Sequence, residues 1–238
     1  MTVKLDRRAA LKLGAGTAAG LVLGFHLPLC ARAQEVGETG TQGNGFGPFL
    51  NAWLRISTDE TVTLVIDRSE MGQGVYTSLP MLLAEELGCE WHRIRVVAAP
   101  ADPVYRNLFL VHELLTRGQE LGETADWLVR RLGRVVGQQV TGGSSSVRGA
   151  FRPLRRAGAA AREMLVTTAA KRLGVPPEEC TVEKGEVRHP PSGRSLTFGA
   201  LAAEAALLEP PRRPQLKANA EWRIIGKSVP RLDLPAKV

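Results

Sequence analysis

The sequence predicts a fold of the α+β class, with a mixed sheet and hairpins packed against helices. Apolar and polar residues alternate on both sides of a Thr-Asp-Glu turn in residues 53–67, which is typical of a β-hairpin. Apolar residues recur at helical spacing in residues 75–87 and again in residues 147–169. The chain has 238 residues, 44% of them hydrophobic and 23% charged, so it is long enough to bury a core.

The helix predicted over residues 75–87 contains a proline. Gly88 follows the last apolar position and is a suitable C-terminal stop. Pro80 removes one backbone hydrogen bond inside a helix, which leaves two arrangements open. Either the helix is kinked at Pro80, or Ser78 caps it and Pro80 lies in its first turn.

Further elements are expected downstream. A strand is predicted at residues 93–100, and two helices within residues 106–136, with a break near residues 118–123. The second of these helices is expected to bury a stripe formed by Trp127, Leu128, Leu132 and Val135.

A long helix is predicted to follow residue 146. Steps of three and four residues give it one buried face, formed by Val147, Phe151, Leu154, Gly158, Ala161, Leu165 and Ala169. A small hairpin is expected at residues 181–189, then a helix capped near Thr197, and finally an extended segment over residues 209–238.

The first 33 residues have the features of an export signal. The pair Arg7-Arg8 precedes an apolar run, and Ala31-Arg32-Ala33 supplies the small side chains that a signal peptidase requires. We therefore predict a twin-arginine signal over residues 1–33 and a periplasmic protein with no stable membrane span after cleavage. A retained membrane anchor is the alternative. Residues 34–48 are rich in glycine and are expected to form a flexible leader to a folded part over residues 49–238.

Charge and cysteine usage narrow the function classes. The formal charge is +7, but removing five basic residues and one acidic residue with the signal leaves 26 − 23 = +3. Neither this charge nor export favours a nucleic-acid partner. Cys89 and Cys180 are expected to be two separate small buried residues, with a disulfide between them as the alternative. Without a CxxC motif or clustered histidines, no metal bound directly by protein side chains is expected.

Two glycine-containing turns each precede a predicted helix. In Gly72-Gln73-Gly74, uncovered backbone N–H groups and the Gln73 amide are expected to meet a polar ligand. The second turn adds three serine hydroxyls and consists of Thr141, Gly142, Gly143, Ser144, Ser145 and Ser146. The alternative is that both are plain turns, and neither matches the GxxxxGK[ST] pattern of nucleotide hydrolysis.

Three arginines follow the second turn on one helix face. Arg148, Arg152 and Arg155 are spaced i, i+4 and i+7 near the positive end of the helix dipole, where cations are unfavourable. A bound phosphate or pyrophosphate would compensate them. Alternatively, they reach solvent or acidic residues elsewhere in the protein.

At these residues the sequence resembles a known family. The stretches "SEMGQGVYTSLPMLLAEEL" and "QVTGGSSSVRGAFRPLRRAGAAAREML" are similar to the molybdopterin-binding subunit of the xanthine dehydrogenase and aldehyde oxidase family, in its exported, isoquinoline 1-oxidoreductase beta-like branch. The similarity covers about residues 54–238. Residues 106–138 resemble a helical insertion between the two motifs, and residues 209–238 lead toward a next domain in that branch.

The resemblance implies a molybdenum hydroxylase that binds molybdopterin dinucleotide and oxidises aldehydes or N-heterocycles with water. It places Gly72, Gln73 and Gly74 against the cofactor and residues 142–146 against its phosphates or pterin. From its position near the start of the helix, Arg148 is expected to bind the same cofactor. It also implies a small [2Fe-2S] subunit and an electron acceptor such as a cytochrome as partners.

The sequence departs from the family in one respect that matters for catalysis. Family members are several times longer, and the carboxylate that acts as catalytic base lies in their far C-terminal part. We assign no catalytic residue here, and Glu70 is interpreted as structural. The alternative function is a non-catalytic cofactor-binding or subunit-assembly module in the periplasm.

Overall fold

The computed structural model describes residues 20–23, 53–102, 105–116 and 122–237. The predicted signal, apart from residues 20–23, and the glycine-rich leader therefore lie outside the described residues. Among the helices that the structure describes, none is both long and apolar enough to span a membrane.

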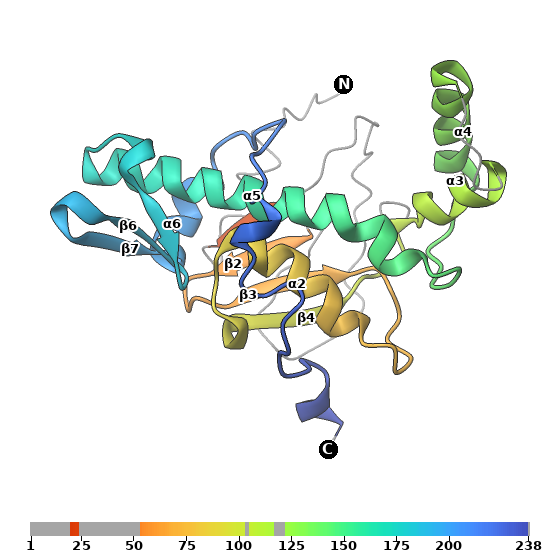
Figure 1. Cartoon of the computed structure of the whole chain (residues 1–238), viewed down its shortest axis with the longest axis horizontal. Coiled ribbons are helices and arrows are strands. Elements are labelled where there is room, and N and C mark those ends of the chain that lie inside the picture. The colour runs from red at the N-terminus through yellow and green to blue at the C-terminus, as the bar shows by residue number, and fades with distance from the viewer. Residues whose placement is uncertain (1–19, 24–52, 103–104, 117–121, 238) are drawn as a thin grey trace, which may run out of the picture.

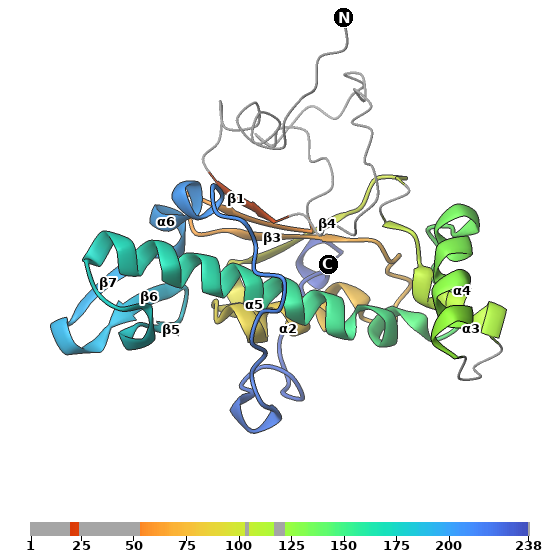
Figure 2. The same ribbon diagram turned by 90° about the horizontal axis from the view of Figure 1, so that it is seen from above.

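A four-stranded sheet forms the first layer of the fold (Figures 1 and 2). Its strands run in chain order and are β1 (Gly20–Leu23), β2 (Leu54–Ser57), β3 (Val62–Ile66) and β4 (Ile94–Ala98). The antiparallel pairing of β2 with β3 confirms the hairpin predicted from the alternating pattern. The parallel pairing of β3 with β4 requires a crossover connection, which a helix supplies.

That crossover is α2 (Val75–Leu87), which ends at Gly88 as predicted. Gly88 adopts the left-handed conformation (φ 78°) that glycine reaches without steric cost. The helix begins at Val75 and runs through Pro80, so the arrangement in which Ser78 caps a later helix is wrong. The turn preceding α2 thus lies at the carboxyl end of a parallel strand, a common place for ligand-binding loops.

The second layer consists of α2 and the long α5 (Ser145–Leu173), which lie on the same face of the sheet (Figure 2). The close approach of the two helices depends on Gly158, because a Cβ atom there would collide with the Leu83 carbonyl oxygen of α2. The predicted buried face is correct from Leu154 onward, but Val147 is 41% exposed because the first turns of α5 extend beyond the core.

A smaller unit lies at the far end of α5 (Figure 1). It is a three-stranded antiparallel sheet followed by a short helix, with elements β5 (Thr181–Glu183), β6 (Glu186–His189), β7 (Arg194–Thr197) and α6 (Phe198–Ala205). As predicted, Thr197 caps α6 by accepting the Ala200 N–H. Cys89 and Cys180 are both free, as expected, but only Cys89 is buried and Cys180 is partly exposed.

The predicted helix pair forms a hairpin that extends from the opposite end of α5 (Figure 1). It consists of α3 (Leu108–Thr116) and α4 (Glu123–Val136). The buried stripe predicted on α4 is wrong, because Trp127, Leu128 and Leu132 are 61%, 50% and 50% exposed. Instead, α4 faces α3 through Asp126, which pairs with His112, and through Gly133. The Val135 side chain lies outside the described residues.

Residues 209–238 are predicted to be extended, but the C-terminal segment (residues 215–237) is irregular and contains the 3₁₀ helices η5 (Asn219–Glu221) and η6 (Leu234–Ala236). Carboxylates of α2 bind this segment. The Oε2 atom of Glu85 accepts the N–H groups of Arg223, Ile224 and Ile225 at 2.8, 2.6 and 3.1 Å. Glu85 is 1% exposed. Burial alone would raise its pKa, but these three N–H groups together with the nearby Lys217 ammonium hold the pKa below the usual value.

The depressed pKa of Glu85 predicts an acid-sensitive C-terminal segment. A carboxylate whose pKa is lower in the folded state adds stability above its unfolded pKa, and this stability is lost as the pH falls through the folded value. We expect Glu85→Gln to be less stable than wild type at pH 7, and the difference to shrink as the pH falls below about 4.5. Urea midpoints of both proteins at pH 7 and pH 3.5 measure this, and a difference that is independent of pH would contradict it.

Candidate functional site

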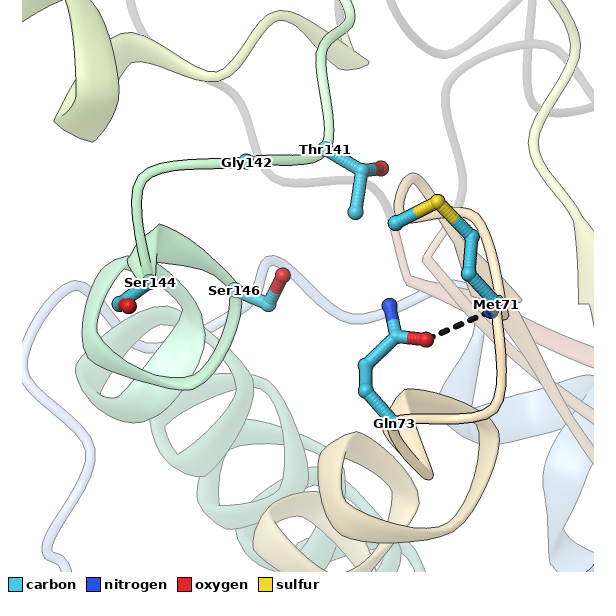
Figure 3. A pocket seen from close by; sticks show the side chains of 6 residues that line it. All are labelled: Met71, Gln73, Thr141, Gly142, Ser144 and Ser146. Atoms are coloured by element: carbon cyan, nitrogen blue, oxygen red, sulfur yellow. Dashed lines mark hydrogen bonds between the residues drawn. The ribbon is translucent and has the colours of Figure 1, made fainter.

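The two predicted turns line one open cavity of about 330 Å³ (Figure 3). We call residues 69–74 the glycine loop and residues 141–146 the serine loop. The cavity is lined by Met71 and Gln73 from the first loop and by Thr141, Gly142, Ser144 and Ser146 from the second. A hydrogen bond from the Ser69 N–H to Thr141 Oγ1 at 2.8 Å joins the loops, although the two residues are 72 positions apart in sequence.

Both helices that follow these loops begin at the cavity. The α2 helix starts directly after the glycine loop and α5 within the serine loop, and the two run in the same direction away from it (Figures 1 and 3). Each helix N-terminus carries a partial positive charge and leaves its first N–H groups unpaired within the helix. The arrangement therefore favours an anionic or strongly polar ligand.

The glycine loop is held together by the Glu70 carboxylate. Its Oε1 atom accepts the N–H groups of Gly72 and Gly74 at 2.8 and 2.9 Å, and its Oε2 atom accepts that of Tyr76 at 3.0 Å. Both glycines adopt positive φ values, 102° and 82°. Burial would raise the pKa of Glu70, but these N–H groups hold it below its usual value.

The contacts of Glu70 show that one expectation from the sequence is wrong. The N–H groups of Gly72 and Gly74 were expected to be uncovered, but the carboxylate of Glu70 already occupies them. The Gln73 amide is likewise engaged within the loop, since its Nε2 donates to the Ser69 carbonyl at 2.8 Å and its Oε1 accepts the Met71 N–H (Figure 3). The glycine loop is thus a preformed wall, with Gln73 and Met71 as the side chains that face the cavity.

The serine loop is the wall that offers donors. Gly143 and Ser144 have positive φ values of 60° and 51°, and Ser144 makes no capping hydrogen bond with its side chain. A positive φ at serine is uncommon and costs free energy, so the surrounding structure must impose it. A Cβ atom added at Gly142 would meet no atom within 4 Å, so the backbone there is open to a close approach by a ligand.

Asn107 organises the serine loop, and sequence analysis missed it. This residue is 0% exposed and its Nδ2 donates to Ser145 Oγ at 2.7 Å and to the Val140 carbonyl at 3.0 Å. Its Oδ1 accepts the Leu110 N–H in the first turn of α3. Asparagine directly before an apolar helical pattern is a typical N-cap, and that signal could have found it. Ser145 points inward and bonds to the Gly142 carbonyl at 2.6 Å rather than lining the cavity.

The arginines of α5 do not line the cavity. Arg148 donates to both carboxylate oxygens of Glu113 in α3, at 2.9 and 3.2 Å. Arg155 is buried and pairs with Glu86 of α2 at 2.7 Å. The alternative in which these arginines reach acidic residues elsewhere therefore holds for both, and their positions give no support for a bound phosphate.

The cavity has the chemistry of a binding site rather than of a reaction centre. None of its six lining residues is a carboxylate, histidine, lysine or cysteine. Among the residues described, no group of three or more His, Cys, Asp or Glu side chains is arranged to hold a metal ion. Burial raises the pKa of the Cys89 thiol to about 12, so this thiol stays protonated at neutral pH.

Comparisons with known proteins agree with a cofactor-binding role. A family profile described as a molybdopterin cofactor-binding domain matches residues 29–106. The chain is 33% identical over 271 residues to the beta chain of isoquinoline 1-oxidoreductase of Brevundimonas diminuta, covering 100% of this chain and 31% of that protein. It is 30% identical over 189 residues to a nicotinate dehydrogenase subunit of Pseudomonas putida, covering 79% of this chain and 13% of that protein.

The chain is also similar to a third curated protein and to a solved structure. A membrane-bound aldehyde dehydrogenase (pyrroloquinoline-quinone) of Gluconacetobacter polyoxogenes is 30% identical over 240 residues, covering 98% of this chain and 26% of that protein. The crystal structure of quinoline 2-oxidoreductase from Pseudomonas putida 86 superposes with a TM-score of 0.41 and 18% identity, over 66% of this chain and 16% of that one. The chain thus spans less than a third of the length of the curated relatives it matches.

Proposed function

Because this chain belongs to the molybdopterin-binding subunits of the xanthine dehydrogenase family, we propose that its cavity holds part of a molybdopterin dinucleotide. The observation that carries the proposal is that the open serine loop, at the N-terminus of α5, and the preformed glycine loop line one cavity whose lining holds no titratable side chain. Such a site suits a ligand that brings both its own negative charge and its own metal.

The serine loop and the glycine loop are expected to bind different parts of the cofactor. The serine loop provides the hydroxyls of Ser144 and Ser146, the open backbone at Gly142 and the positive end of α5, which together suit phosphate oxygens. The glycine loop provides the Gln73 amide, whose second N–H and second oxygen lone pair are left over from its contacts with Ser69 and Met71 and suit a polar heterocycle such as a pterin. Gly72, Gly74 and Gly143 act through the backbone shape they permit, and Ser145 fixes the serine loop from inside.

The activity of the full-length subunit follows from the cofactor. When bound, the molybdenum cofactor supplies the redox chemistry by which an aldehyde or an N-heterocycle is oxidised with oxygen from water. The described residues of this chain bind and orient that cofactor, and electrons leave through a separate [2Fe-2S] subunit to an acceptor such as a cytochrome. The predicted twin-arginine signal supports a periplasmic assembly, because that route carries proteins folded around a cofactor.

One observation favours a second candidate. Because no lining residue is an acid or a base, the cavity on its own supports a non-catalytic cofactor-binding or subunit-assembly module. Molybdenum and phosphorus analysis of protein purified from its native host tests both candidates together. A folded sample without stoichiometric amounts of either element would overturn cofactor binding, while a loaded sample that oxidises neither aldehydes nor N-heterocycles would favour the second candidate.

A double substitution tests the serine loop directly. Each hydroxyl that bonds a charged phosphate is worth about 1.5 kcal/mol, so Ser144→Ala with Ser146→Ala is expected to weaken cofactor retention on the order of 100-fold. The fold of the cofactor-free protein should be unaffected, because Ser144 is exposed and Ser146 is only partly buried. Ser195→Ala, at an exposed position of β7, is the matched control. Unchanged molybdenum content in the double variant would contradict the assignment.

A further inference from the structure

The C-terminal segment reaches the glycine loop through one arginine. Arg231 lies 161 residues from Glu70 in sequence, and its Nη2 atom is 3.4 Å from Glu70 Oε1. Its Nη1 donates to the carbonyl oxygen of Gly72 at 3.4 Å. One guanidinium therefore contacts both the carboxylate that organises the loop and the loop backbone itself.

The guanidinium is itself held in place. Its Nε and Nη2 atoms donate to the two carboxylate oxygens of Asp233 at 2.9 and 2.8 Å, a paired geometry that fixes the plane of the group. Lys237 pairs with the same carboxylate at 2.6 Å. Asp233 is 7% exposed, while the side chains of Arg231 and Lys237 are 34% and 50% exposed.

Neighbouring backbone contacts set the position of this part of the segment against α2. The Leu232 N–H donates to Thr77 Oγ1 in the first turn of α2 at 3.2 Å. The Trp91 indole donates to the Pro230 carbonyl at 2.9 Å. The segment is therefore attached on both sides of Arg231, which leaves the arginine little freedom to move away from the loop.

We propose that Arg231, anchored by Asp233, is a positioning residue that holds the glycine loop in its cofactor-binding shape. Glu70 must remain a carboxylate in a fixed place to bind the N–H groups of Gly72, Gly74 and Tyr76 at once. The guanidinium of Arg231, which contacts the Oε1 atom, supplies that constraint. Gly72 and Gly74 would otherwise sample many conformations, because glycine restricts its backbone least. The C-terminal segment thus preorganises one wall of the cavity from outside.

The role in cofactor binding depends on the proposed function, but the effect on the loop does not. The first measurement is therefore hydrogen exchange of the Gly72, Gly74 and Tyr76 amides in cofactor-free protein. In Arg231→Gln we expect these three amides to exchange about tenfold faster or more, with β3 amides unchanged. Arg231→Lys should restore only part of the protection, since an ammonium cannot bond Glu70 and Asp233 as a planar fork does.

The second measurement is molybdenum content per folded chain after expression in the native host. We expect a severalfold lower content in Arg231→Gln and wild-type content in Arg188→Gln, a control that loses an exposed ion pair with Glu186 in the small sheet. Unchanged exchange at the three amides, or faster exchange with wild-type retention of the cofactor, would overturn the inference. Wild-type protein without molybdenum would instead overturn the proposed function. Asp233→Asn provides a second variant should Arg231→Gln fold poorly, and the same outcomes decide it.

Discussion

Replacing Gly158 with valine is expected to destabilise the protein by about 3 kcal/mol, because an added side chain here overpacks the interface between α2 and α5. A Cβ atom at this position collides with the Leu83 carbonyl oxygen and lies 3.0 Å from Glu86 Cβ and 3.2 Å from the Leu87 nitrogen. Two of these three neighbours are backbone atoms in the C-terminal half of α2, which cannot move without shifting the helix. Urea unfolding followed by circular dichroism measures the loss.

The same substitution should also disturb the site. Because α2 and α5 each begin at one wall of the cavity, forcing the helices apart at Gly158 changes the distance between the glycine loop and the serine loop. Gly133→Ala in α4 is a useful control, since its Cβ would meet only a side-chain methyl of Val111, at 3.3 Å, which can give way. Alanine also raises helix propensity by about 1 kcal/mol there. If the urea midpoint of Gly158→Val equalled that of the wild type, the inference that α2 and α5 pack closely at this residue would be wrong.

The sequence predicted most of the fold because its signals were local. Alternation in residues 53–67, helical spacing before Gly88 and the cap at Thr197 each specify an element through neighbours a few residues away. The wrong prediction of a buried stripe on α4 also came from relying on local signals. Helical periodicity showed that Trp127, Leu128 and Leu132 share a region of the helix surface, but only the tertiary arrangement shows that α3 contacts α4 at Gly133 instead.

The site was harder to predict because its decisive contacts are long-range. The glycine and serine loops were recognised from their residues, but their N–H groups could not be assigned partners from sequence spacing. Glu70 takes those of the glycine loop, and Arg231 reaches Glu70 from 161 residues away. Likewise, the sequence is consistent with a phosphate beside Arg148, but in the structure Glu113 of α3 supplies the opposite charge. Charge near a helix N-terminus predicts that compensation exists, not which group provides it.

Glu86 of α2 supplies the negative charge that balances arginines of α5. Glu86→Ala is expected to lower the free energy of unfolding by about 3–5 kcal/mol, the range for removing one partner of a buried ion pair. The Glu86 carboxylate is 0% exposed and binds Arg155 at 2.7 Å, Arg162 at 3.3 Å and the Lys217 N–H at 2.9 Å. Alanine would therefore leave a buried guanidinium without its counter-charge and release the C-terminal segment at Lys217. The Arg155 guanidinium also lies over the rings of Phe151 and Trp222, 5.3 and 5.1 Å from their centroids, and these contacts keep it at this buried position.

The matched control is Glu163→Ala on α5, whose carboxylate also accepts an N–H of the C-terminal segment, from Gln215 at 2.6 Å, but at an exposed position. Because water can replace that contact, its loss should cost about 1 kcal/mol or less. The unfolding free energies of the two variants, measured side by side in urea at pH 7, separate burial of charge from attachment of the segment. Equal losses in both would show that attachment alone matters. A much larger loss in Glu86→Ala is the expected result, because only there does an arginine remain buried without a partner of opposite charge.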